Sequence, residues 1–318
     1  MAETEPQKHL VIGLPEAGKT TFLAALWHVA ESGEVPDSLS LTKLQGDLSH
    51  LNKIRDTWLG CSPVGRTQQA SQTATMVQTV LSLNDPISGQ TSEVIFPDVA
   101  GEVFSIQWEK RQCSKEYDEL MAHAGGLLLF IHSVKVNQPE RIGKKVQDLI
   151  EALGEDDEVL ATTSPQIEVS GNPTPWSPER SPTQVQLVDL LQTVIRRSRH
   201  RIPLRLAVII SAWDLVAQTQ LPTRNLQQAP SDWLKTRLPF LDQFLTSNGD
   251  KLEKRVYGVS ASGGDYSTQQ DQLLKALISS QRIVVEGESC GKHDITAPVR
   301  WVMRLPDKKG FSTDDRTL

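Results

Sequence analysis

His9-Leu-Val-Ile-Gly-Leu-Pro-Glu-Ala-Gly-Lys-Thr-Thr21 is the stretch that decides how this chain folds. Residues 10–12 read as a short apolar strand, and the residues behind them have the G-x-x-x-x-G-K-T spacing of a phosphate-binding loop. Residues 22–30 then repeat apolar side chains at helical spacing. A strand before the loop and a helix after it are the context that the motif needs, which a chance match in a glycine-rich turn would lack. The stretch predicts a nucleotide-binding protein.

The chemistry of this loop follows from its residue types. Its glycines let the backbone turn so that successive N–H groups point at one anion. Lys19 adds a positive charge that stabilises the transferring phosphoryl group, and the Thr20 hydroxyl is a ligand for Mg²⁺. The side chain of Glu16 is expected to turn to solvent. We expect the phosphates to be bound by Pro15, Glu16, Ala17, Gly18, Lys19, Thr20, Thr21 and, further along the chain, Gly101.

Composition limits the class of protein. The formal net charge of −6 offers no basic field, so we expect no direct binding to nucleic acid or to a membrane. Three widely spaced cysteines and scattered histidines suggest neither a disulfide framework nor a zinc site. The apolar runs are too short to span a bilayer, and the N-terminus lacks the apolar core of a signal peptide. A cytoplasmic protein is therefore expected.

One enlarged domain is predicted over residues 9–305, between a polar lead-in at 1–8 and a loose C-terminal tail at 306–318. Two segments exceed what a minimal nucleotide-binding domain needs. Residues 33–66 repeat apolar residues in steps of three or four and are predicted as a helical insertion. Residues 155–182 are rich in Pro, Ser and Thr and are predicted as a disordered loop.

Apolar patterns along the chain alternate between strand-like and helix-like. Strands are predicted at 10–12, 75–84, 93–96, 125–131, 204–210 and 256–262, with a further extended piece at 282–285. Helices are predicted at 19–30, 114–123, 140–153, 185–199, 231–249, 269–280 and 296–304. The predicted fold class is α/β, with a mostly parallel central sheet, helices on both faces and one antiparallel hairpin strand. Ligand loops then lie at the C-terminal ends of the strands.

Asp98 and Gly101 follow the predicted strand at 93–96. A carboxylate at this point can hold Mg²⁺ through water, and glycine lets the backbone approach the terminal phosphate. Alone, a D-x-x-G sequence is more often an ordinary turn. Its place after a strand and downstream of a phosphate loop favours a role in the nucleotide site.

Asp214 is the candidate for reading the base. Guanine offers two adjacent donors, its N1–H and its N2 amino group, to a carboxylate that can only accept. Adenine would leave that carboxylate unpaired, so the residue favours GTP over ATP. The alternative is an aspartate that caps the next helix. Ser260, Ala261 and Ser262 end the next strand, where a backbone N–H can reach the guanine carbonyl, although a plain polar loop has the same composition.

In this order, the phosphate loop, Asp98 to Gly101, Ser211 to Asp214 and Ser260 to Ser262 resemble the motifs of the Ras-like P-loop GTPases of the translation-factor-related class. Finer features resemble the double-GTPase family of bacterial conflict systems. They are Asp98-Val-Ala-Gly-Glu102, the Gly125 to Phe130 run, Trp213 before Asp214, and the ending from Arg282 to Trp301. The resemblance covers nearly the whole chain except the proline-rich loop.

This resemblance implies a molecular switch that depends on Mg²⁺, binds GTP, hydrolyses it to GDP and works beside co-encoded protein partners. A role in prokaryotic defence is expected from the resemblance alone. Ser211 and Ala212 replace the Asn/Thr-Lys of the family's base motif, so the stacking by the lysine stem is lost. Ser211 and Trp213 join Asp214 as base-binding candidates, and whether Trp213 replaces the lost stacking is left open by the sequence. Glu102 stands where Ras-like enzymes carry a glutamine that orients water, so slow hydrolysis is expected.

The threonine that senses Mg²⁺ and the terminal phosphate has three candidates, Thr67, Thr73 and Thr75. Thr67 is favoured because Arg66 adjoins it, and the pair could bring a metal ligand and a catalytic arginine together. Each threonine could equally be an ordinary loop residue, and Arg66 could be a solvated surface residue.

Two other functions fit part of the pattern. A nucleotide-binding scaffold with negligible hydrolysis is compatible with the changes at Glu102, Ser211 and Ala212. An ATPase or small-molecule kinase would need an arginine-rich lid, for which the arginines between 196 and 201 are the candidates, although they also fit a solvated helix end.

Overall fold

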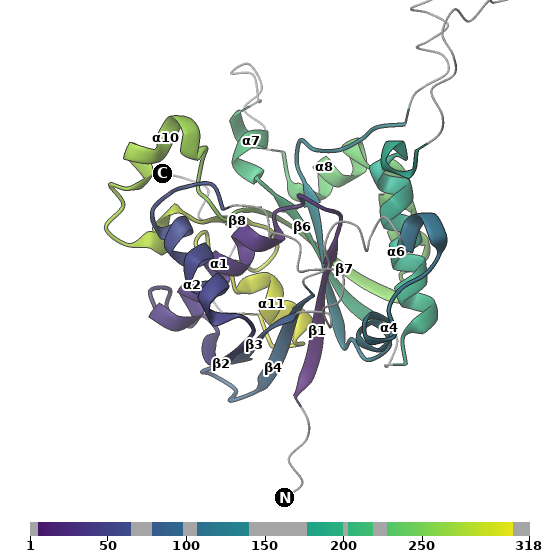
Figure 1. Ribbon diagram of the computed structural model, residues 1–318, viewed down its shortest axis with the longest axis horizontal. Coiled ribbons are helices and arrows are strands. Elements are labelled where there is room, and N and C mark those ends of the chain that lie inside the picture. Colours follow the sequence, from purple (N-terminus) through teal and green to yellow (C-terminus); the bar gives the residue numbers. More distant parts are fainter. Residues whose placement is uncertain are drawn as a thin grey trace, which may run out of the picture.

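The computed structural model describes residues 6–64, 78–97, 107–139, 177–199, 203–218 and 228–307. The strands within these ranges are β1 Gln7–Gly13, β2 Ser40–Gln45, β3 Gln78–Asn84, β4 Thr91–Pro97, β5 Gly126–His132, β6 Leu204–Ser211, β7 Leu252–Ser260 and β8 Val284–Glu286. They pair into one eight-stranded sheet with the order β2-β3-β4-β1-β5-β6-β7-β8 (Figure 1).

The middle of the sheet is parallel. Strands β4, β1, β5, β6 and β7 run in one direction, so their carboxyl ends meet at one edge, here called the carboxyl edge. Strand β3 is antiparallel to both of its neighbours, and β8 is antiparallel to β7. Residues 127–131 and 206–210 are buried without interruption because helices cover both faces of the sheet. This architecture confirms the predicted fold class.

Helices form a layer on each face (Figure 1). One layer holds α1 Lys19–Ser32, α2 Leu48–Leu59 and α11 Ala297–Val302. The other holds α4 Lys115–Ala122, α6 Thr183–Arg197, α8 Pro230–Arg237 and α9 Pro239–Ser247. Helices α7 Trp213–Gln218 and α10 Tyr266–Leu273 follow β6 and β7 at the carboxyl edge, and short 3₁₀ turns span Pro178–Arg180 and Ser279–Arg282. None of the helices in the described ranges has the length and apolar character needed to cross a bilayer.

Side-chain alternation along β5 divides the core between these layers. Phe130 packs edge-on against Phe22 of α1, with ring centroids 4.9 Å apart. Leu129 and Ile131 belong to the core on the opposite face, under α6. Sequence positions next to one another on a central strand therefore support different helix layers.

The prediction of a helix across residues 33–66 is wrong at its start. Residues 40–45 form β2, and only α2 is helical. A β-bulge between Leu41 and Lys43 shifts the register of β2, so Leu41 and Leu44 both pack on the core that α1 covers. Their three-residue spacing is therefore the same as that of two residues on one face of a helix. Asp47 then starts α2 by accepting hydrogen bonds from the amides of Ser49 and His50.

The single helix predicted at 231–249 is also wrong. The chain forms α8 and α9 with a break at Leu238, because Pro239 has no N–H for a continuous helix and instead begins the second one. The helix predicted at 269–280 starts earlier, at Tyr266, where Asp265 caps it, and ends at Leu273. The helix predicted at 140–153 and most of the 155–182 loop lie outside the described residues. The division into lead-in, single domain and tail stays a prediction.

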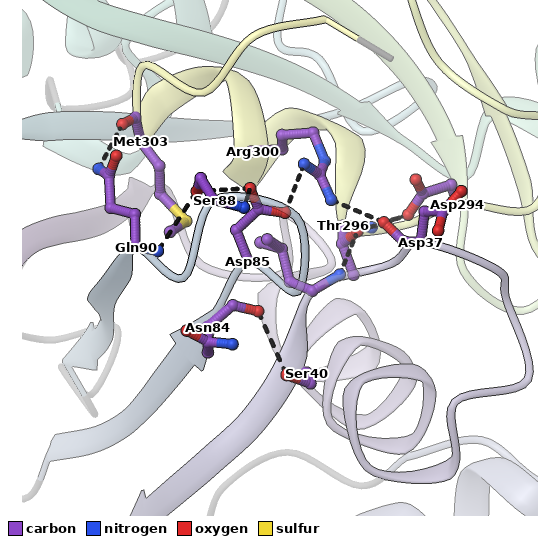
Figure 2. A network of polar contacts seen from close by, with 11 residues as sticks. Asp37, Ser40, Asn84, Asp85, Ser88, Gln90, Asp294, Thr296, Arg300 and Met303 are labelled. Carbon is purple, nitrogen blue, oxygen red and sulfur yellow. Dashed lines mark hydrogen bonds and ion pairs between the residues drawn. The ribbon is translucent and has the colours of Figure 1, made fainter. Parts of the chain in front are cut away.

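A buried polar network joins helix α11 to the edge of the sheet opposite the carboxyl edge (Figure 2). The guanidinium of Arg300 in α11 lies 2.8 Å from the carboxylate of Asp85, in the turn between β3 and β4. Arg300 also donates to the carbonyl oxygen of Asp37 at 2.6 Å. Thr296 extends the network, because its hydroxyl accepts a hydrogen bond from the amide of Leu39. Three segments far apart in sequence are thus joined in the interior.

Asp85 stays ionised in this network despite being fully buried. Burial acts to raise the pKa of Asp85, but hydrogen bonds from Ser88 and Arg300 outweigh it and hold that pKa below its usual value. A buried carboxylate that depends on its partners in this way makes Arg300 a structural residue.

Candidate nucleotide site

The phosphate loop joins β1 to α1 at the carboxyl edge. Its backbone has positive φ at Gly13, Glu16 and Gly18, with values of 145°, 61° and 86°. A Cβ at Gly13 would lie 2.6 Å from the carbonyl oxygen of Phe130, and one at Gly18 would lie 2.8 Å from the hydroxyl of Ser211. Both glycines are therefore required by conformation and by close approach. The structure forms the strand, loop and helix that the motif predicted.

Lys19 is held inside the curve of this loop. Its ammonium group donates to the carbonyl oxygens of Gly13 and Leu14, both at 2.7 Å. Burial lowers the pKa of Lys19 to about 8. Helix α1 begins at the same residue, and its N-cap, Gly18, supplies no side-chain cap. A positive charge and a helix N-terminus thus converge at the loop, which is the chemistry of an anion site.

Asp214 and Ser260 meet at the ends of β6 and β7. Asp214 lies in the first turn of α7, and its carboxylate accepts a hydrogen bond from the Ser260 hydroxyl at 2.5 Å. The Ser260 oxygen in turn accepts from the amide of Gly263 at 3.1 Å. This pair fixes the orientation of the carboxylate and closes the turn that follows β7.

A cavity of about 110 Å³ lies between the start of α1 and the segments that end β6 and β7. Its walls come from the phosphate loop and α1, from β5, and from the ends of β6 and β7 with the residues that follow them. The lining residues are Gly18, Thr21, Phe22, Phe130, His132, Ile209, Ser211, Ala212, Val259, Ala261 and Ser262. The hydroxyl of Ser211 is buried there, and no described residue forms a hydrogen bond with it. A buried hydroxyl in need of a partner fits a polar ligand.

The model of the double-GTPase 1 family matches residues 10–302. The chain belongs to the double-GTPase 1 family. Membership confirms the resemblance drawn from the motifs, and it implies that this double-GTPase binds a guanine nucleotide.

Two solved structures are similar to this double-GTPase at low identity. One is the signal recognition particle receptor SRb-GTP/SRX complex from Chaetomium thermophilum, with 15% identity over 81% of this chain and 92% of that chain and a TM-score of 0.33. The other is the GTP-bound Ski7 GTPase-like domain of S. cerevisiae, with 13% identity over 81% of this chain and 43% of that chain and a TM-score of 0.34. No curated protein matches the sequence.

The structure does not bring every base-binding candidate of this double-GTPase to the cavity. Ser211, Ala261 and Ser262 line it. Asp214 and Ser260 contact each other beside it and are not among its lining residues. Trp213 does not line it, because its ring packs against Gly258 in the core on the face opposite α1. Ala212 has a positive φ of 50°, and the chain turns there. The Trp213 ring therefore does not replace the missing lysine stem at the cavity.

Several predicted residues lie outside the described part of the chain. They are Arg66, Thr67, Thr73, Thr75, Asp98, Gly101 and Glu102. Thr20 is half-buried at the start of α1. Within the described ranges, no cluster of three or more His, Cys, Asp or Glu side chains could hold a metal ion. Pro15 and Glu16 are exposed, and Glu16 forms an ion pair with Lys135 at 2.7 Å.

His132 is a cavity residue that the sequence analysis missed. Its Nδ1 lies 3.2 Å from the amide nitrogen of Val134 and 3.3 Å from that of Lys135, so Nδ1 accepts and the proton of the neutral ring sits on Nε2. Burial lowers the pKa of His132, nearby Lys135 lowers it further, and Asp214 acts in the opposite sense. Its position in the sequence could have indicated it, because His132 ends a buried parallel strand and such strands end at the carboxyl edge.

Proposed function

We propose that this double-GTPase is a cytoplasmic molecular switch that binds GTP with Mg²⁺ and hydrolyses it slowly. The observation that carries the proposal is the shared cavity, since Gly18 of the phosphate loop and Ser211, Ala261 and Ser262 of the base loops line the same space. One ligand with a phosphate end and a base end would account for both groups of residues. The change between GTP and GDP would alter affinity for co-encoded protein partners, and a defence role is proposed from the family resemblance.

The residues present fit a nucleoside triphosphate. The glycines at 13 and 18 leave room for close approach of the backbone, and Lys19 carries the charge that phosphates require. Ser211 supplies a buried hydroxyl without a partner among the described residues. Thr20, Asp98 and Thr67 are the proposed Mg²⁺ ligands, and the metal would supply positive charge to the phosphate oxygens.

Guanine selectivity is assigned to Asp214. Its carboxylate only accepts, and the hydrogen bond from Ser260 fixes its direction. Guanine can donate to it from N1–H and the N2 amino group, whereas adenine presents an acceptor at N1 and leaves Asp214 with only the hydrogen bond from Ser260. The amides of residues 260–262 would donate to the guanine carbonyl oxygen.

Hydrolysis would proceed by attack of water on the terminal phosphorus, in line with the bond to the GDP leaving group, so that GDP and inorganic phosphate are released. Lys19 and the loop amides would stabilise charge on the transferring group. Glu102 would position the water and Arg66 would approach the phosphates, and Gly101 would donate its amide to the terminal phosphate. A glutamate accepts a proton but cannot donate to the phosphate when ionised, so turnover without a partner is expected to be slow.

Base selectivity gives the first test. Wild type should bind GTP far more tightly than ATP or xanthosine triphosphate, and Asp214→Asn should exchange GTP preference for xanthosine triphosphate. The asparagine amide donates where xanthine offers a carbonyl oxygen. Competition against a fluorescent GTP analogue measures all three ligands. An unchanged guanine preference in Asp214→Asn would show that another residue reads the base.

A second candidate function is a nucleotide-binding scaffold with negligible hydrolysis. The replacement of the family's Asn/Thr-Lys by Ser211 and Ala212 at the cavity favours it, since these short side chains hold the nucleotide by fewer contacts. Single-turnover hydrolysis of labelled GTP by wild type and Lys19→Ala separates the two functions. Phosphate release that depends on Lys19 supports the switch, and its absence supports the scaffold.

A further inference from the structure

The insertion helix α2 reaches the loop that is assigned to the base. The indole Nε1 of Trp58 donates a hydrogen bond of 2.8 Å to the carbonyl oxygen of Ala261. Trp58 is fully buried, and Ala261 is 8% exposed. A buried carbonyl has few partners other than this indole, so the hydrogen bond sets the direction of the peptide that joins Ala261 to Ser262.

Arg282 holds Trp58 in place. Its guanidinium carbon lies 4.6 Å from the centroid of the Trp58 ring. The same group donates to the carbonyl oxygens of Trp58 and Leu59, at 3.3 and 3.2 Å. Arg282 is 6% exposed, so its charge is satisfied by these contacts in the interior. The end of α2 is therefore fixed by a side chain from the 3₁₀ turn.

The same turn supports the base loop directly. A Cβ at Gly263 would lie 2.3 Å from the carbonyl oxygen of Arg282, so the loop and the turn are in close contact. On the other side, the His28 ring of α1 lies 5.3 Å from Trp58, and His28 pairs with Glu34 at 3.0 Å. Trp58 thus stands between the helix that begins at the phosphate loop and the loop after β7.

We infer that Trp58 is a positioning residue for guanine recognition. It orients the Ala261 peptide so that the backbone of residues 260–262 can donate to the 6-oxo group of the base, and Arg282 keeps Trp58 in that position. The inference rests on the proposed function. A minimal nucleotide-binding domain does not need the segment around α2. The inference gives this segment a role in selecting the base.

Two tryptophans in one core layer allow a matched test. Trp58→Phe removes the indole N–H that contacts Ala261. Trp27→Phe is the control, because Trp27 is also buried and also lies under an arginine, with Arg55 at 4.4 Å, but its Nε1 has no hydrogen-bond partner among the described residues. Both variants lose the same volume and keep an aromatic ring, and only Trp58→Phe removes a hydrogen bond to the base loop.

The measurement is competition of GDP and of 2-aminopurine riboside diphosphate, which lacks both the 6-oxo group and the N1–H, against a fluorescent GDP analogue. The lost N1–H acts at Asp214 in wild type and variants alike, so a change in preference between them reports the 6-oxo group. Trp58→Phe should lower the preference for GDP about tenfold, the worth of one buried hydrogen bond, and Trp27→Phe should leave it unchanged. Arg282→Lys loses the paired hydrogen bonds to the carbonyl oxygens of Trp58 and Leu59, and it should also lower the preference for GDP. If Trp58→Phe does not fold, this second variant tests the inference.

The outcomes separate two claims. An unchanged preference in Trp58→Phe, or an equal loss for both nucleotides, overturns the positioning role of Trp58 and leaves the proposed function standing. Wild type that does not prefer GDP over the 2-aminopurine nucleotide overturns guanine recognition itself, and the inference with it.

Discussion

The Ser260 hydroxyl donates a 2.5 Å hydrogen bond to the Asp214 carboxylate, across the ends of two neighbouring strands. The amide of Gly263 donates to the same serine oxygen, so the hydroxyl proton is directed at Asp214. The orientation of the base-reading candidate therefore depends on a residue of the following strand.

Ser260→Ala should weaken GDP binding about tenfold, because the carboxylate loses a charge-assisted hydrogen bond and its fixed direction. Equilibrium binding of a fluorescent GDP analogue measures the change. Ser267→Ala is the control, since Ser267 donates to Asp265 in the same way but at the exposed start of α10. Equal affinities in wild type and Ser260→Ala would mean that Asp214 needs no support.

Nucleotide affinity should fall as the pH rises through about 8, the lowered pKa of Lys19. Above that pH the unliganded protein loses the ammonium charge that attracts phosphates, whereas below it the charge is fully present. Binding at pH 8 to 9 should therefore be accompanied by proton uptake, which calorimetry in buffers of different ionisation enthalpy detects. Lys19→Arg should lose this pH dependence, because guanidinium stays protonated throughout. A flat profile in wild type would contradict the assignment.

Gly18→Ala should abolish nucleotide binding, because its φ of 86° is strained for alanine and its Cβ would lie 2.8 Å from Ser211. Gly33→Ala is a matched control, with φ of 66° at the end of α1 and open space around the new methyl group. Gly33→Ala should cost about 1 kcal/mol of unfolding free energy and leave affinity unchanged. Thermal unfolding and ligand titration of both variants test the pair. Full binding by Gly18→Ala would argue against close approach of a ligand here.

Ser211→Ala should stabilise the unliganded protein and weaken nucleotide binding. Its buried hydroxyl has no partner among the described residues, so removing it should raise the free energy of unfolding by about 1 kcal/mol. Ser92→Ala is the control, because that hydroxyl is also buried and without a described partner but lies at the start of β4, at the opposite edge. The free energy of unfolding measured in urea should rise in both variants, and only Ser211→Ala should bind GDP more weakly. Unchanged affinity would remove Ser211 from the site.

Arg300→Met should lower the free energy of unfolding by about 3 kcal/mol or more, because it leaves Asp85 buried without its ion pair. Arg304→Met, at a 41% exposed side chain, should cost less than about 1 kcal/mol. Denaturant unfolding compares the two. Since the network lies at the edge opposite the phosphate loop, affinity for GDP should stay the same in both proteins. A small effect of Arg300→Met would show that water replaces the guanidinium.

Much of the fold could be predicted because it depends on local patterns. The short, unbroken apolar runs at 127–131 and 206–210 are typical of central strands, and the spacing of Gly13 and Gly18 between a strand and a helix is typical of a phosphate-binding loop. The motifs after β6 and β7 could be placed at one edge, since parallel strands bring their carboxyl ends together.

The errors arose where a local pattern has two solutions. The bulge in β2 gave Leu41 and Leu44 a helical spacing, and Pro239 begins a helix as readily as it ends one. Trp213 was expected at the base, but the turn at Ala212 sends its ring into the core. The contact between Trp58 and Ala261 joins residues 203 positions apart, and no short-range pattern contains it.

The place of α11 has a consequence for synthesis of the chain. Among the described helices, the layer that α1 begins near the N-terminus also needs α11 at residues 297–302, whereas the last helix of the opposite layer, α9, ends at residue 247. A chain emerging from the ribosome therefore has the described helices of one layer before the last helix of the other, and the part of β5 and β6 that α11 covers must wait for residues 297–302. We expect the interior contact of Arg300 with Asp85 to be among the last that the nascent protein can form, because its two residues are synthesised 215 positions apart.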